Sequence, residues 1–225
     1  MIKNKTRIIN ILFYFIIFFS LTIPATSKVH GENLQGISIK IDLWAKELYV
    51  IEGEKVIKGY KISPGTDQTP TPIGTFMIIK KDKDWGGGFG TRWLGLDVPW
   101  GDYGIHGTNK PWLMGKNISG GCIRMQNKDV EELFEIVSEG TVVHIEGPIT
   151  GFGRGELKPL SIGSKGTLVQ IVQERLKLMS LYNGKVHGIY NKETERAVKV
   201  FQKENNLPIT GGITKREYIL LGILE

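Results

Sequence analysis

The sequence reads Ile37-Ser38-Ile39-Lys40-Ile41-Asp42-Leu43, with an apolar side chain at every second position. Successive side chains of a strand point to opposite faces of a sheet, so this period of two predicts a strand with one buried face. Leu48 to Ile51 and Val56-Ile57 flank a glycine-containing turn and predict a hairpin. A further strand is expected at Thr75 to Ile79, after a proline-rich stretch. The chain is therefore expected to begin its folded part with β structure.

The middle of the chain is rich in glycine. Residues 84–121 hold 11 of the 29 glycines and show little periodicity, and loops of that length in a compact domain are usually functional. A helix is expected next, because apolar residues recur at helical spacing from Val130 to Val137. Asn127 is expected to cap this helix and Gly140 to end it, and residues 141–145 to return as a strand.

The last third of the chain has a different pattern. Apolar residues at helical spacing predict two helices, around 168–176 and 194–201, and Thr214-x-x-Glu217 is a capping box for a short third one. We therefore expect two domains. Residues 36–147 form a mainly-β domain, as mixed sheets or a sandwich with one or two helices, and a glycine-rich linker at 148–157 leads to a small all-α three-helix bundle at 158–225.

The first residues have the layout of a secretory signal peptide. Lys3, Lys5 and Arg7 precede an apolar run from Ile8 to Ala25, and small residues follow it. Residues 1–27 are therefore expected to be a signal peptide, with a retained membrane anchor as the alternative. Either form predicts an exported protein that is extracellular or associated with the cell wall, and touches the membrane only through an uncleaved segment.

Charge and cysteine content exclude several classes of protein. The chain has 29 Lys and Arg against 23 Asp and Glu, and loss of the three basic residues of the signal segment would leave a net charge of +3. That excess is too small to predict a nucleic-acid partner. A single Cys excludes an intrachain disulfide and a zinc site built from several cysteines, so we expect neither a metal site nor a cofactor.

The single cysteine lies in a sequence suited to catalysis. Cys122 follows Gly120-Gly121, which allow a sharp turn whose N–H groups point at one spot. Such donors stabilise the oxyanion of an acyl-transfer intermediate. A thiol needs a base, since only the thiolate attacks, and His106 lies 16 residues earlier between two glycines. From the residues alone, Cys–His chemistry and a small buried cysteine remain open alternatives.

The two motifs together resemble a known family. His106-Gly107-Thr108 followed by Ser119-Gly120-Gly121-Cys122-Ile123-Arg124-Met125 closely resembles the active-site signature of the bacterial L,D-transpeptidase catalytic domain. Thr71-Pro72-Ile73-Gly74-Thr75-Phe76 resembles another stretch of that family. The resemblance covers about residues 36–147, and one departure is Gly120, where many members have His.

The resemblance implies a reaction. Cys122 attacks the carbonyl before the terminal D-Ala of a peptidoglycan tetrapeptide stem, D-Ala leaves, and a thioester forms. An amine of a second stem then attacks, which gives a 3→3 cross-link and contributes to cell-wall organisation and cell shape. His106 acts as base and then as acid. The resemblance also implies that carbapenems acylate Cys122.

The resemblance also implies roles for the neighbouring residues. The Gly107 carbonyl orients His106, and the N–H groups of Gly121 and Cys122 form the oxyanion hole. Arg124 and Ser119 are expected to bind substrate, with support of the loop as the alternative for both.

The helical region resembles the three-helix peptidoglycan-binding domain of many cell-wall enzymes, through Leu160 to Gly166, Tyr182 to Tyr190 and Thr194-x-x-Ala197-Val198-x-x-Phe201-Gln202. The expected partners are therefore peptidoglycan stem peptides and glycan strands. Two alternatives stay open for the whole chain: an L,D-carboxypeptidase that uses the same site, and a non-catalytic wall-binding protein.

Four tryptophans surround the two motifs, namely Trp85, Trp93, Trp100 and Trp112. Some are expected in the core, and one or two in a substrate groove or lid. His144 lies on an expected strand and is interpreted as structural.

Overall fold

The computed structural model describes residues 36–149 and 157–224, which belong to one compact unit. The expected signal peptide at 1–27 and residues 150–156 of the expected linker lie outside the described residues.

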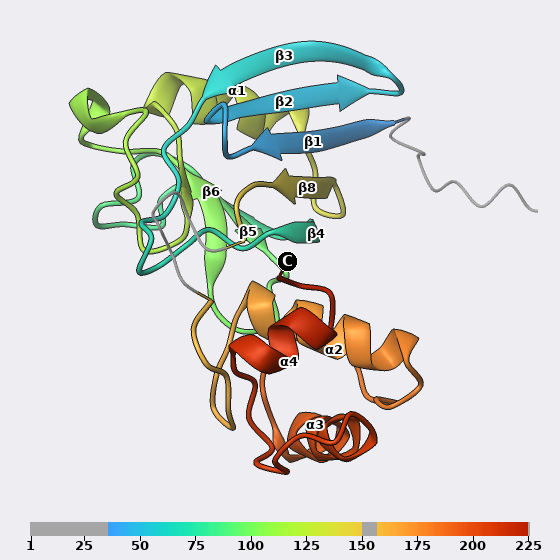
Figure 1. Ribbon diagram of the computed structural model, residues 1–225. Coiled ribbons are helices and arrows are strands. Elements are labelled where there is room, and N and C mark those ends of the chain that lie inside the picture. Colours follow the sequence, from blue (N-terminus) through green and yellow to red (C-terminus); the bar gives the residue numbers. More distant parts are fainter. Residues whose placement is uncertain (1–35, 150–156, 225) are drawn as a thin grey trace, which may run out of the picture. The chain divides into compact units, whose positions relative to one another are not determined.

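The β-rich part is a single mixed sheet whose eight strands lie in the order β3-β2-β1-β8-β4-β5-β6-β7 (Figure 1). All neighbours are antiparallel except β1–β8 and β6–β7, which run parallel. This confirms the mixed-sheet form of the expected fold. The strands are β1 (Ile37–Asp42), β2 (Glu47–Glu52), β3 (Lys55–Lys61), β4 (Gly74–Asp82), β5 (Trp93–Leu96), β6 (Tyr103–His106), β7 (Ile123–Arg124) and β8 (Val142–Glu146).

The alternation in β1 has the expected effect. Ile39 and Ile41 are buried in the core, while Lys40 between them forms an ion pair with Glu146 on the other face of the sheet. The helix α1 (Asn127–Ile136) contributes Val130, Leu133 and Phe134 to the same core. Burial of one apolar face of the sheet against one stripe of a helix is what stabilises a layered fold of this kind.

Two strands in the glycine-rich middle were not expected. β5 is buried at all four positions, so it lacks the alternation that reveals a half-buried strand, and β6 contains a glycine. The interpretation of residues 84–121 as loops without strands was therefore wrong for these eight residues. Between β6 and β7 the chain forms only a short 3₁₀ turn, η1 (Pro111–Leu113).

The ends of α1 also differ from expectation. Gln126, not Asn127, is the N-cap residue, and the helix ends at Ile136, before the turn that contains Gly140. The Asn127 side chain accepts a hydrogen bond from the Thr91 N–H at 3.3 Å instead. A contact with a distant loop has thus replaced the local cap.

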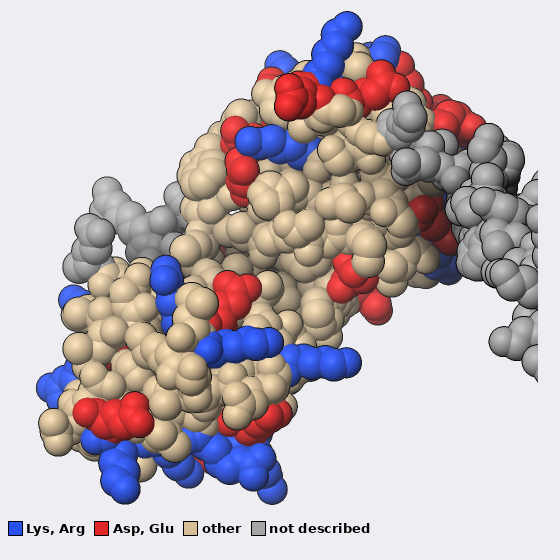
Figure 2. All heavy atoms as spheres, turned by 90° about the vertical axis from the view of Figure 1, so that its right-hand side faces the viewer, with Lys and Arg blue, Asp and Glu red and all other residues tan. Residues whose placement is uncertain are grey.

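The three expected helices are α2 (Thr167–Leu178), α3 (Lys192–Glu204) and α4 (Lys215–Leu220). They share a separate apolar core, and the capping box of Thr214 and Glu217 is present. Residues 157–224 contain 11 Lys or Arg and five Asp or Glu, and basic side chains are prominent over this helical region in Figure 2. Within the part of the chain that the structure describes, no helix has the length and apolarity needed to cross a membrane.

Candidate active site

The sheet brings the two motifs to neighbouring strands. β6 and β7 pair in parallel, with Ile105 opposite Ile123 and His106 opposite Arg124. The two isoleucines are fully buried in the core. Because side chains alternate along a strand, His106 and Arg124 point to the other face, and so does Cys122, one residue before β7. Cys122 lies beside Gly104, and the Trp93 ring fills the space that a side chain there would take, since a Cβ at Gly104 would lie 2.7 Å from a carbon of that ring.

His106 is held by its own backbone neighbour. Its ring Nδ1 lies 2.6 Å from the Gly107 carbonyl oxygen. A carbonyl only accepts, so Nδ1 carries the proton and Nε2 is the basic nitrogen. His106 is 2% exposed, and this burial lowers its pKa to about 4, although hydrogen bonds to the backbone of Gly107 and Phe89 act in the opposite direction. The imidazole is therefore neutral, and able to accept a proton, at neutral pH.

Aromatic rings enclose the imidazole. Phe89 meets it edge to face at 4.9 Å between centroids, and Trp93 stacks on it at 5.8 Å and an interplanar angle of 25°. Trp85 stacks on Trp93 at 5.2 Å, and the Lys80 ammonium lies 4.0 Å from the Trp85 ring centroid. From the sequence, Trp93 was expected near the site, in the core or in a substrate groove or lid. Its contact with His106 was not expected, because the β5–β6 pairing that sets the two residues opposite each other was not.

Asn127 fixes the peptide that follows the histidine. A Cβ at Gly107 would lie 2.2 Å from the Asn127 Oδ1 and 3.1 Å from the Thr91 nitrogen, and a Cβ at Gly90 would lie 2.3 Å from the same oxygen. Only glycines fit so close to this side chain. Asn127 was interpreted from the sequence as a helix cap, and its place behind the His106–Gly107 peptide had no local signal.

Cys122 is partly exposed as a residue. Burial raises the pKa of the thiol, while a hydrogen bond from the Gly104 backbone and the positive charge of Arg124 lower it. The net shift is upward, so the resting cysteine is a thiol rather than a thiolate. At rest the site therefore contains a neutral thiol and a neutral imidazole.

The loop before Cys122 is braced by Ser119. The buried Ser119 hydroxyl donates to the Cys122 carbonyl and accepts from the Gly121 N–H at 3.0 Å. These contacts give Ser119 the supporting role that was its alternative, and a substrate contact for it stays a prediction. The Gly121 N–H points to Ser119 here, so its expected place in the oxyanion hole requires this bond to be exchanged.

Gly121 is required by its conformation. Its φ is +116°, and a Cβ there would lie 2.6 Å from a Tyr103 ring carbon. Gly120 differs, since a Cβ at that position would have nothing within 4 Å. The His that many family members carry at this position therefore has room to fit.

A second segment supports the cysteine loop from outside. The Pro64 carbonyl accepts from the Ile118 and Ser119 N–H groups, at 3.1 and 3.2 Å. Thr71, the first residue of the third sequence motif, accepts from the Gly65 N–H at 2.9 Å and so shapes this segment. The motif therefore acts on the site through the loop and not through contact with Cys122.

Arg124 lies next to both reacting groups. Its charge lowers the pKa of His106 and that of Cys122. Its Nε is buried and has no hydrogen-bond partner among the described residues. A buried donor of this kind carries an energetic cost that an anionic ligand would remove.

The structure also places the two remaining tryptophans and His144. Trp112 is 69% exposed on η1, and Trp100 contacts Phe76 edge to face at 6.1 Å. His144 is exposed, and its Nδ1 lies 2.7 Å from the Thr75 hydroxyl oxygen. Among the described residues, no group of three or more His, Cys, Asp or Glu could hold a metal ion.

Comparison with known proteins agrees with this geometry. A family model described as the L,D-transpeptidase catalytic domain matches residues 36–145. Residues 36–145 are thus similar to this family's catalytic domain. A model of the peptidoglycan binding domain matches residues 165–217. Both domain resemblances noted in the sequence are thereby confirmed.

Curated L,D-transpeptidase relatives match part of the chain. YkuD of Bacillus subtilis, named as an L,D-transpeptidase, is 48% identical over 107 residues, which are 48% of this chain and 64% of that protein. YqjB of the same organism, named likewise, is 40% identical over 114 residues, which are 44% of this chain and 65% of that protein. The chain thus spans slightly less than two thirds of the length of these relatives.

Solved L,D-transpeptidase structures align with the same domain. The NMR structure of the catalytic domain from E. faecium L,D-transpeptidase shares 27% identity with a TM-score of 0.44, over 50% of this chain and 98% of that chain. The structure of the Ldtfm-avibactam carbamoyl enzyme shares 28% identity with the same TM-score, over 51% of this chain and 50% of that chain.

Proposed function

We propose that this protein is an exported peptidoglycan L,D-transpeptidase in which Cys122 carries the acyl group as a thioester. The observation that carries the proposal is the pairing of β6 with β7, which sets His106, Arg124 and Cys122 on one face of the sheet. The partly exposed Cys122, the buried neutral imidazole and the unpartnered Arg124 Nε together suit acyl transfer from an anionic peptide.

In the first step, His106 Nε2 takes the Cys122 proton as the sulfur bonds to the carbonyl carbon before the terminal D-Ala. The carbonyl oxygen becomes an oxyanion, for which the Cys122 N–H and, once released from Ser119, the Gly121 N–H are the nearby donors. The tetrahedral intermediate collapses, His106 gives its proton to the leaving amine, and D-Ala departs. The enzyme is left as a thioester with a neutral His106.

In the second step, an amine of another stem attacks the thioester carbonyl. His106 takes the proton that the amine loses and returns it to the sulfur as the thioester bond breaks, which restores the thiol. The product is a 3→3 cross-link. Attack by water on the same intermediate would make the protein an L,D-carboxypeptidase.

The environment of the two groups supports this sequence of steps. The pKa of the thiol is raised and that of the imidazole is lowered, both mainly by burial. An ion pair of thiolate and imidazolium is therefore disfavoured at rest, and the base works only when a carbonyl is in place to accept the sulfur. Trp93 and Phe89 keep water from the imidazole until then.

The second domain and the first residues suggest where the reaction takes place. The peptidoglycan binding domain at 165–217 supports attachment to the wall polymer. The basic and apolar pattern of residues 1–27 supports export. We infer a protein that works at the cell wall, with β-lactams of the carbapenem type as reagents that acylate Cys122.

The test is an incubation of purified protein with disaccharide-tetrapeptide, followed by mass spectrometry of the products. The wild type is expected to release D-Ala and to form cross-linked dimers, and Cys122→Ala is expected to do neither. Tripeptide monomers without dimers would assign the carboxypeptidase reaction. Equal dimer formation by Cys122→Ala would refute the proposed role of the cysteine.

A further inference from the structure

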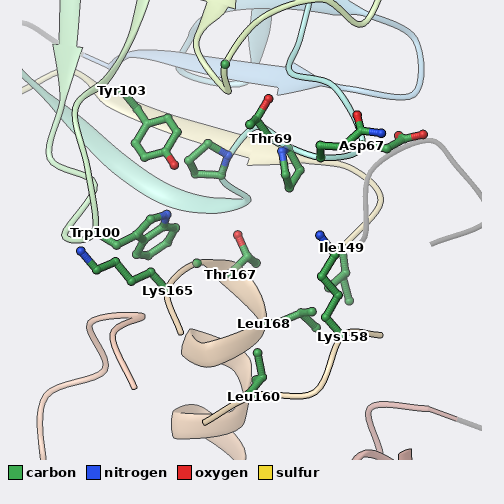
Figure 3. Close-up of a pocket in the computed structure, with 15 residues that line it drawn as sticks. Asp67, Thr69, Trp100, Tyr103, Ile149, Lys158, Leu160, Lys165, Thr167 and Leu168 are labelled. Atoms are coloured by element: carbon green, nitrogen blue, oxygen red, sulfur yellow. The ribbon is translucent and has the colours of Figure 1, made fainter. Parts of the chain in front are cut away.

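A cavity of about 420 Å³ lies beside the loop that carries Cys122. Its volume falls within the range of sites that bind small molecules. One wall comes from the catalytic domain and includes Pro70, Trp100 and Tyr103; the other comes from the start of the helical domain and includes Lys158, Lys165 and Thr167. Figure 3 shows Tyr103, Trp100 and Thr167 directed toward the same space.

The cavity is close to the reacting centre. Gly120 is part of its lining, two residues before the cysteine. The ring of Tyr103 lines it as well and packs so tightly on Gly121 that a Cβ there would lie 2.6 Å from it. A peptide that presents an amide to the Cys122 sulfur therefore has this space directly beside its neighbouring residues.

The wall from the helical domain is fixed by specific contacts. The Ile73 N–H donates to the Thr167 hydroxyl at 3.2 Å. The Trp100 ring packs against Gly188, where a Cβ would lie 2.4 Å from a ring carbon, and from the other side it contacts Phe76. Only glycine at position 188 allows this approach. The cavity is thus built by packing that depends on residues of both domains.

The lining suits one class of ligand. The rings of Trp100 and Tyr103 and the prolines Pro70 and Pro72 offer apolar surface to a peptide backbone and its short side chains. Lys158 and Lys165 stand on opposite sides of the cavity in Figure 3, against Asp67 as the single acidic residue of the lining. Two ammonium groups around an apolar floor favour a peptide that carries free carboxylates.

We propose that this cavity binds the peptidoglycan stem peptide next to its reacting amide, with the stem's carboxylate groups near Lys158 and Lys165. The helical domain then contributes directly to substrate binding, in addition to any attachment to the wall. The ligand class rests on the proposed function, whereas the cavity itself does not.

The test measures binding of a soluble synthetic tetrapeptide stem. Because this ligand is not attached to the wall polymer, its binding does not depend on attachment of the helical domain to the wall. Calorimetry is performed on the full chain carrying Cys122→Ala, so that no turnover occurs. Lys165→Ala and Lys158→Ala are each expected to raise the Kd about two- to fivefold, and the double variant more, as the loss of partly exposed charge contacts implies. Lys177→Ala, on α2, exposed and outside the cavity lining, is the matched control and is expected to leave the Kd unchanged.

Three results would overturn the proposal. They are an unchanged Kd in the double lysine variant, equal binding of a stem whose carboxylates are all amidated, and equal binding of a saccharide without a peptide. Each lysine variant with Cys122 intact is also labelled with iodoacetamide, and wild-type labelling rates show that the cysteine loop is undamaged.

The two proposals can fail separately. Stem binding that depends on the lysines, in a wild-type protein that releases no D-Ala, refutes the transpeptidase reaction and supports the cavity. If the wild type releases D-Ala but the lysine variants bind the stem as tightly as their parent, the transpeptidase reaction is supported and the cavity proposal is refuted.

Discussion

Acidification is expected to destabilise this protein through His106. The imidazole is buried among Phe89 and Trp93, and burial lowers its pKa to about 4. In the unfolded chain the same group has an ordinary pKa of about 6.5. Between these two values the unfolded state binds a proton that the folded state does not, so stability falls as the pH falls from 6.5 to 4.

The size of the effect follows from the difference in pKa. Each unit corresponds to about 1.4 kcal/mol, so the shift of His106 from 6.5 to about 4 should remove about 3 kcal/mol of the unfolding free energy by pH 4. That is a large fraction of the 5–15 kcal/mol that stabilises a typical domain. Carboxylates also titrate in this range, so the contribution of His106 has to be isolated by a variant.

The contribution of His106 is isolated by urea unfolding of the wild type and of His106→Asn, measured from pH 7.5 to pH 4. The difference in unfolding free energy between the two proteins should change by about 3 kcal/mol over that range, in favour of the variant at low pH. A constant difference between the wild type and His106→Asn would refute the argument from burial.

Four further variants test the site. Gly121→Ala forces a Cβ against Tyr103 at a φ of +116°. This variant should lower the unfolding free energy measured in urea by ~1–3 kcal/mol and slow D-Ala release at least ~100-fold. Gly120→His meets open space, so its unfolding free energy should stay within ~0.5 kcal/mol of the wild type, and a larger loss would contradict the geometry. Trp93→Ala should lower the unfolding free energy by ~3–5 kcal/mol. By admitting water to His106, it should also move the acid limb of the pH–rate profile to higher pH. Trp93→Phe, which keeps a ring on the imidazole, should largely restore the profile.

Much of the fold was predictable because its signals are local. The alternation in residues 37–43 depends only on which face of the strand is buried, and the capping box at Thr214 is formed within one helical turn. β5 escaped prediction because it is buried on both faces, so its four residues carry no period. Asn127 was misinterpreted because its partner, Thr91, lies 36 residues away, and no local pattern marks that contact.

The site was predictable only for the residues that lie in the two short sequence motifs. Cys122 and His106 are recognisable from the glycines near them and from their spacing. Their supports are not, because each depends on a strand pairing. Trp93 reaches His106 only through the register of β5 and β6, and Tyr103 reaches Gly121 only because β6 lies beside β7. Support of the loop by Ser119 was one of two roles expected from the sequence, and its hydrogen bond with the Gly121 N–H is visible only in the structure.

The position of β8 has a consequence for how the domain folds during synthesis. It is the last strand of the domain, yet it pairs with β1 on one side and β4 on the other. Until residues 142–146 have been synthesised, the hairpin region of β1 to β3 and the strands that hold the catalytic pair share no backbone ladder. Pairing over such a separation is slow, so a nascent chain keeps two open sheet edges until β8 has been synthesised, and this is when it is most exposed to aggregation or to chaperones.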